Sequence, residues 1–412
     1  MLLRSIRSSL ILILFVSQGI AQPIVRSEYY AEMPFWESPV VAFRGAYPLT
    51  VERAAQRINL KLDYDEHNRV VQASVRIGDK LKPFEGRFGN LYINAPRTTV
   101  TYDKNKERHQ FYDILGNRIT VLNDVYEKLY VKDEHGRNIS LKFLDQDGNP
   151  ASDYYGNRKF EWNYRTDGSV VERRTDAEGN ITPLRGEFQF MLTRITYGSD
   201  GQVNMLQNIN EDGSQVNAPC GASTLKYFYD SQGRFLRWEV YDKEGNPAIG
   251  PSNTAGEYNV FDGIGLSSIV FFGKEGRPAT HWSGAERWAY KRDAFGNILE
   301  LAFLDADGNL KLGNRGYAGI QFVWGKQGRF LQSQTYIGAD GKAMNHSELG
   351  VATTKYVHSS KGLVTEVTYL DASGRIVARK DNQVARIRHS YHDNGVLDQT
   401  THFDLNNKAI TQ

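Results

Sequence analysis

The chain has 412 residues, of which 40% are hydrophobic and 12% aromatic, and this apolar content excludes a wholly disordered protein. Its 50 basic and 48 acidic residues nearly cancel, which argues against a strongly basic nucleic-acid-binding protein, so we expect no nucleic-acid partner. The single cysteine, Cys220, cannot form an internal disulfide, and stability must therefore come from packing.

Residues 1–21 have the features of a secretory signal peptide. Arg4 and Arg7 give a positive start, an apolar run covers 10–16 (LILILFV), and Gly19–Ala21 has the small-x-small form of a cleavage site. The run is less than half as long as the ~20 residues of a transmembrane helix, so we expect export without a membrane span. The mature protein is then periplasmic, secreted or on the cell surface; an uncleaved membrane anchor is the alternative.

The rest of the chain divides into three segments, which differ in how closely they follow a repeated sequence pattern. Residues 22–60 lack the repeat and are expected to form an N-terminal leader or cap, with a short helix within 49–60 (LTVERAAQRINL). Residues 61–129 carry weak copies, such as Tyr64–Asn68 (YDEHN), and are expected to form degenerate β repeats. Residues 130–412 carry regular copies and are expected to form a β-hairpin repeat domain.

Two series of glycine turns alternate through the regular copies, each with a period of 31 to 34 residues. In the first turns, an aromatic residue usually stands four positions before the glycine; these glycines are Gly136, Gly168, Gly201, Gly233, Gly265, Gly296, Gly328, Gly362 and Gly395. The second turns read Asp-x-x-Gly-Asn or a relative, with Asn407 in the last copy; their glycines are Gly148, Gly179, Gly213, Gly245, Gly276, Gly308, Gly341 and Gly374. Glycine supplies the positive φ of tight hairpins, and Asp or Asn beside it bonds its own backbone.

The segments between the turns are rich in β-branched and aromatic residues, as in Phe235–Tyr241 (FLRWEVY), which predicts strands. Six positions before the first-turn glycine stands a mostly aromatic column, expected to form one continuous interior: Tyr130, Trp162, Ile195, Tyr227, Tyr290, Phe322 and Tyr356. The pattern predicts an all-β fold, an elongated, twisted antiparallel β-hairpin repeat array of about nine units, solenoid-like in form. A closed shell and a propeller are the alternatives.

Two motifs carry a resemblance to known repeat families. Tyr391–Leu397 (YHDNGVL) resembles the YYxNGxL hairpin of MORN-type repeats, and Tyr229–Arg234 (YDSQGR) resembles the YDxxGR unit of RHS/YD-type repeats in exported bacterial proteins. The resemblance covers about 102–408 and implies antiparallel hairpin arrays that bind, encase or scaffold. It implies no particular activity.

No motif of the chain predicts a catalytic, cofactor or metal site. The DQDGN stretch at Asp145–Asn149 superficially suggests a calcium loop, but aligning Gly148 with the invariant glycine of an EF-hand puts Phe143 and Tyr154 at the ligand positions. His389 and His392, three apart on a strand, point to opposite faces. We therefore expect no cofactor, and turn chemistry explains the acidic motifs better than metal binding.

Trp282 and Trp288 are the best candidates for an exposed contact, because they flank a variable segment outside the aromatic columns. Unpaired strand edges at the array ends are a second candidate surface. The sequence favours an exported, non-catalytic protein that binds or scaffolds a protein, glycan or envelope component. The alternative is a secreted or periplasmic enzyme, or its accessory subunit, with a groove shaped by the repeats and with convergent carboxylates or histidines. Neither the partner's identity nor the oligomeric state follows from the sequence.

Overall fold

A computed structural model describes residues 23–33, 38–41, 43–83, 94–183, 189–325 and 327–410. The predicted signal peptide at 1–21 lies outside these residues. Within them the protein is all-β: 27 strands form one sheet, every named pairing is antiparallel, and one five-residue helix, α1 (Val51–Ala55), interrupts them. The predicted fold class, an antiparallel β-hairpin repeat array, is confirmed.

The N-terminal elements include two antiparallel hairpins, at 58–77 and 97–112, but are less regular than the later repeats. The short helix expected within 49–60 is α1, which Thr50 caps by accepting a hydrogen bond from the Arg53 backbone N–H. The strands around it are β1 (Arg26–Glu32), β2 (Ala46–Leu49), β3 (Ile58–Tyr64), β4 (Val70–Ile77), β5 (Lys80–Leu81), β6 (Arg97–Asp103) and β7 (Lys106–Tyr112).

The repeats add two strands per unit, as predicted. They are β8 (Glu127–Lys132), β9 (Asn138–Leu144), β10 (Pro150–Ala151), β11 (Lys159–Tyr164), β12 (Val170–Thr175), β13 (Leu192–Tyr197), β14 (Val203–Ile209), β15 (Thr224–Tyr229), β16 (Phe235–Tyr241), β17 (Gly256–Asp262), β18 (Gly265–Phe272), β19 (Arg287–Arg292), β20 (Ile298–Leu304), β21 (Gly319–Trp324), β22 (Leu331–Ile337), β23 (Thr353–His358), β24 (Val364–Leu370), β25 (Arg386–Tyr391), β26 (Leu397–Phe403) and β27 (Ala409–Ile410).

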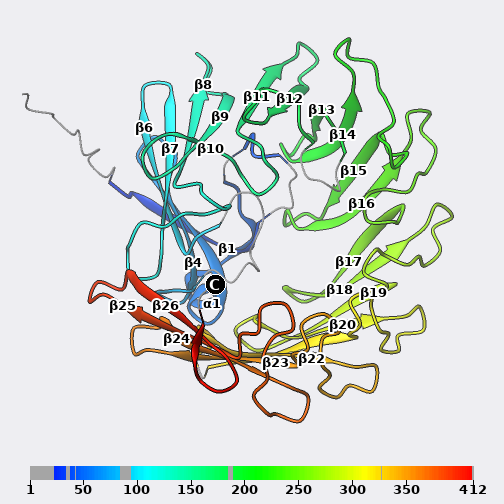
Figure 1. The fold of residues 1–412 in the computed structure, drawn as a ribbon. Helices are drawn as coiled ribbons and strands as arrows, with labels where there is room; N and C mark the ends of the chain where they lie inside the picture. The colour runs from blue at the N-terminus through cyan, green and yellow to red at the C-terminus, as the bar shows by residue number, and fades with distance from the viewer. Residues whose placement is uncertain are drawn as a thin grey trace, which may run out of the picture.

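Neighbours in the sheet are almost always neighbours in sequence. β2, β1, β3, β4, β6, β7, β8, β9 and β11 pair in that order, and from β11 each strand pairs with the next as far as β27. Among the described strands no pairing joins the two ends, so the sheet is open. Figure 1 shows that the array nevertheless bends round on itself, with β1 and α1 near its centre.

The turn glycines adopt the predicted left-handed backbone, with φ of +74° at Gly201 and +83° at Gly148, and Asn407 takes φ of +59° in place of glycine. Gly265 is the exception. The positive φ lies at Gly263, and Asp262 pairs directly with Gly265 across a two-residue turn. A glycine at the first central position of such a turn is typical of type II′ hairpins, which explains why the turn lies two residues earlier than its repeat position predicts.

In most turn motifs an aspartate holds the turn by its side chain. In the repeat around Gly233, Asp230 Oδ1 accepts the backbone N–H groups of Gln232 and Arg234, both at 2.9 Å. Asp230 Oδ2 accepts Arg234 Nε at 2.7 Å, and the Arg234 guanidinium lies 4.1 Å from the ring centre of Phe261 in the next unit. The YDxxGR motif therefore closes its own hairpin and stacks one unit on the next.

The acidic loop at Asp145–Asn149 follows the same chemistry. Asp145 Oδ1 accepts the backbone N–H groups of Asp147 at 2.9 Å and Asn149 at 2.8 Å. Its oxygens are thus used by the turn, as the sequence predicted.

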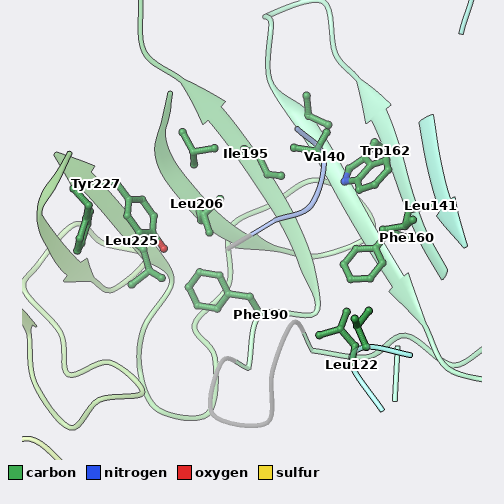
Figure 2. Packing of buried hydrophobic residues seen from close by; sticks show 14 of the residues in the cluster. Val40, Leu122, Leu141, Phe160, Trp162, Phe190, Ile195, Leu206, Leu225 and Tyr227 are labelled. Carbon is green, nitrogen blue, oxygen red and sulfur yellow. The ribbon is translucent and has the colours of Figure 1, made fainter. Parts of the chain in front are cut away.

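The predicted column is buried where the N-terminal residues cover it. Tyr130, Trp162, Ile195 and Tyr227 are at most 4% exposed and belong to one large cluster that also contains Val40 from the N-terminal segment. Figure 2 shows Val40 beside Trp162 of β11. Burial of aromatic and aliphatic side chains on this scale is the main stabilising contribution to the fold.

The prediction of one continuous interior is wrong for the later units. The large cluster ends at Ala248, and separate clusters form around Phe303 and around Tyr369. Val40 and Phe43 pack against the large cluster, whereas the described residues of the clusters around Phe303 and Tyr369 include none from the N-terminal segment.

Candidate binding surface

The N-terminal residues contact successive first turns in the order of the sequence. Asn138 Nδ2 donates to Val40 O at 2.9 Å, and Arg44 Nη2 donates to Asp200 O at 2.7 Å. Tyr47 N donates to Gln232 O, and Ile58 N to Phe295 O, both at 2.8 Å. Each step along the N-terminal segment therefore meets a later unit.

The same order continues to the last unit. Arg329 Nη2 donates to Leu81 O at 2.7 Å, and Lys82 Nζ lies 4.0 Å from the ring centre of Trp324. Asn117 Nδ2 donates to Asn394 O at 3.0 Å. The first turns thus face the N-terminal residues, and the loops that follow the second turns form the other end of the strands.

These loops, which we call the loop rim (described residues 250–254, 281–285, 313–317 and 346–350), bond to one another. Trp282 N donates to Ser252 O at 3.0 Å, and Asn314 N donates to Ser283 O at 2.8 Å. Ser347 Oγ donates to Arg315 O at 3.3 Å. Because each loop ties to the next, the rim is a continuous surface across several units.

Trp282 stands on this rim with 49% of its surface exposed. The Arg315 guanidinium carbon lies 5.9 Å from its ring centre, and its backbone O accepts Asn314 Nδ2 at 2.6 Å. An exposed tryptophan beside an arginine, held by a bonded backbone, is the kind of group that dominates protein and glycan interfaces.

The structure brings both predicted tryptophans together through His281. The His281 ring centre lies 4.9 Å from that of Trp282 and 4.8 Å from that of Trp288, and stacks on Phe271 at 4.3 Å. Burial lowers the pKa of His281 to about 4, so the ring is neutral at physiological pH. The uncharged His281 ring supports Trp282, and its Nδ1 accepts the Ser283 backbone N–H at 3.1 Å.

Trp288 is half-buried. The sequence suggested an exposed contact outside the aromatic columns, but the ring packs against other aromatic residues. Its ring packs between Phe271 at 5.2 Å and Phe303 at 6.1 Å, and Nε1 donates to Ser283 Oγ at 3.0 Å. It lies eight positions before Gly296, two from the predicted column, and strand periodicity places it on the same face.

One pocket has the convergent charged groups expected of an enzyme. It has a volume of about 290 Å³ and is lined by Val40, Phe43, Glu107 and Lys132 among others. Glu107 accepts from Lys132 Nζ at 2.8 Å and contacts His109 Nε2 at 2.7 Å.

The pKa shifts in this pocket point to a structural ion pair. Burial opposes ionisation of Glu107, but the bond to His109 and the charge of Lys132 lower its pKa to about 2. Burial lowers the pKa of His109, which stacks on Phe43. A carboxylate with this pKa is a poor proton donor or acceptor near neutral pH, so the cluster fits a role in seating the N-terminal segment better than acid–base catalysis.

A larger cleft of about 640 Å³ lies over β11 and β12. Its charged side chains largely neutralise one another: Arg137 Nη2 lies 2.7 Å from Asp133 Oδ2, and Arg173 pairs with Glu211. Within the ranges that the structure describes, no group of three or more metal-ligating side chains converges, and no helix is long and apolar enough to cross a membrane.

No family model and no curated protein matches the chain. Solved structures that the chain matches include TcdB2-TccC3-Cdc42, at 11% identity and a TM-score of 0.24, with 87% of this chain and 22% of that chain covered. TcdB2-TccC3 matches at 11% identity and a TM-score of 0.22, covering 87% of this chain and 24% of that one. A porin-like protein from Bacteroides uniformis matches at 11% identity and a TM-score of 0.17, with coverage of 83% and 86%.

The chain therefore spans about a fifth to a quarter of the two TcdB2-TccC3 chains, and TM-scores this low carry no argument for a shared function.

Proposed function

We propose that the protein is an exported, non-catalytic binding or scaffold module for a protein, glycan or envelope component. The observation that supports this function is the loop rim, where bonded loops present Trp282 and Arg315 on one continuous surface. His281 packs against the Trp282 ring, and Trp288 packs against His281 in turn. Rigid aromatic anchors bind partners at low entropic cost, which suits a repeat scaffold.

The surface is tested by affinity capture with the mature chain, residues 22–412. Trp282→Ala is compared with Leu312→Ala, a control variant that removes an exposed side chain next to the rim, 48% exposed. We expect a partner captured by the wild-type protein and by Leu312→Ala, and lost at least tenfold with Trp282→Ala. Glycan and protein arrays then identify the class of ligand. Equal capture by all three proteins would exclude the surface around Trp282.

Export is tested separately by fractionation of the natural host. A mature N-terminus at Gln22, found in the periplasm, at the cell surface or in the medium, supports the proposal. A full-length chain that remains in the cytoplasm would exclude the exported role while leaving the surface test unaffected.

A further inference from the structure

Three arginines meet where α1 packs against the first turns of two successive units. Arg53 lies on α1, Arg57 follows it, and Arg292 ends β19. They line a pocket of about 410 Å³, together with Asp262, Asp293 and the backbone around Gly265. The pocket is separate from the loop rim, since none of its lining residues belongs to the rim loops.

Arg57 is held in an unfavourable position for a cation. Burial lowers its pKa, and the positive charges of Arg53 and Arg292 lower it further, opposed by Glu32. Its Nε is buried and has no hydrogen-bond partner among the described residues. A buried donor without an acceptor costs free energy, so the protein leaves the Arg57 side chain incompletely satisfied.

Arg292 is fixed in place before any ligand arrives. Its Nε donates to Leu266 O at 3.0 Å and its Nη1 donates to Gly296 O at 2.9 Å. Asp293 is engaged by its own turn, because Oδ1 accepts Asn297 N at 2.8 Å and Oδ2 accepts Asn297 Nδ2 at 2.9 Å. The pocket thus keeps a preorganised cation, and one of its two lining carboxylates is already bonded.

We propose that this pocket binds a doubly charged oxyanion, a sulfate or phosphate group, on Arg53, Arg57 and Arg292. Guanidinium groups match the oxygen spacing of such anions and donate two bonds at once. The proposal goes beyond the binding role assigned to the loop rim and does not depend on it.

Glu32, at the end of β1, does not line the pocket, but its negative charge acts on Arg57 and Arg292. Burial raises its pKa to about 6, while Arg292, Arg234 and Arg57 act against that rise and Asp230 adds to it. As the pH falls through 6, Glu32 takes up a proton and its negative charge disappears from beside the arginines. Sulfate keeps its double charge in this range and should therefore bind more tightly at pH 5.5 than at pH 7.5.

The test is titration of the mature chain with inorganic sulfate by calorimetry, at constant ionic strength set with chloride. We expect saturable binding that weakens at least tenfold in Arg53→Gln and in Arg57→Gln. Arg277→Gln removes an exposed arginine of a second turn and should leave binding unchanged. Because Arg53 is exposed, its variant tests the site even where Arg57→Gln fails to fold.

Glu32→Gln should bind sulfate tightly at both pH values and lose the pH dependence. Absence of saturable binding to the wild-type protein, or equal binding by Arg53→Gln, would overturn the proposal, as would wild-type affinity that does not rise on acidification. A monosaccharide phosphate ester, titrated beside inorganic phosphate at pH 7.5, where both are mainly doubly charged, completes the test: tighter binding than inorganic phosphate identifies a sugar-borne group, and equal or weaker binding identifies the free anion.

Discussion

The side chain of Leu115 lies directly against Gly395, so that a Cβ added at Gly395 would stand 2.2 Å from Leu115 Cδ1. Leu115 belongs to the turn after β7, and Gly395 belongs to the first turn of the last repeat unit. This contact brings the last unit of the array beside its beginning, although no strand pairing among the described residues joins them.

Gly395→Ala should therefore destabilise the protein more than Gly374→Ala. Both glycines have left-handed φ, +85° and +82°, so the backbone strain of about 1 kcal/mol is common to the two variants. A Cβ at Gly374 meets nothing within 4 Å, whereas at Gly395 it displaces Leu115. Because Leu115 is 38% exposed and can turn aside, chemical denaturation should show a small additional loss in Gly395→Ala, of roughly 0.5–1 kcal/mol. Equal losses would show that the Leu115 contact is not made in solution.

Replacing Trp288 should destabilise the protein much more than replacing Trp282. Trp288→Ala removes a ring packed between Phe271 and Phe303 and should cost about 3–5 kcal/mol. Trp282→Ala removes a half-exposed ring and should cost less than about 1 kcal/mol. Thermal unfolding measures both. A large loss in Trp282→Ala would mean that its ring is a structural element rather than a free contact.

Acid should unfold the protein partly through Glu107. Its pKa is lowered to about 2 in the folded state, below the ordinary glutamate value of 4.5, so its stabilising contribution is complete above pH 4.5 and is lost as the pH falls towards 2. Glu107→Gln should remove this part of the pH dependence, on the order of 3 kcal/mol between pH 5 and pH 2. Denaturant midpoints for both proteins across this range provide the measurement, and parallel curves would contradict the assignment.

The aspartate of the YDxxGR turn, Asp230, should stabilise the fold through its hydrogen bonds as well as through its charge. Asp230→Ala loses two backbone hydrogen bonds and the contact that positions Arg234, and should cost about 2–3 kcal/mol. Asp230→Asn keeps an oxygen for the backbone N–H groups and should lose about half as much. Urea denaturation of the two variants distinguishes these roles. Indistinguishable losses would show that the carboxylate charge alone matters.

The hairpins could be predicted because their causes are local. Gly148 and Gly201 need positive φ, and the aspartates around them bond within five residues, so the repeat is visible in the sequence. The turn expected at Gly265 forms at Gly263, because both positions are glycine and the repeat spacing does not distinguish between them.

The path of the array and the arginine pocket depend on contacts between distant residues. The backbone of Tyr47 meets Gln232 through main-chain atoms, which leave no side-chain pattern. Arg53 and Arg57 show an i, i+4 spacing in the sequence, but Arg292 joins them only after the array has bent. Trp288 lies eight positions before Gly296, outside the columns at four and six positions, but the same strand face also presents the residue two positions further from the turn.

The central claim is that the array bends round the N-terminal residues, and one distance tests it directly. Spin labels at Thr120 and Asp393, attached in a Cys220→Ser variant that lacks the native cysteine, report the distance between the loop after β7 and the first turn of the last repeat unit. Because Asn117 bonds to Asn394, the account predicts a narrow electron–electron distance distribution below about 30 Å. A straight array of the same strands, spaced ~4.8 Å apart, would separate the labels by roughly 80 Å, and a long distance without a short peak would contradict the account.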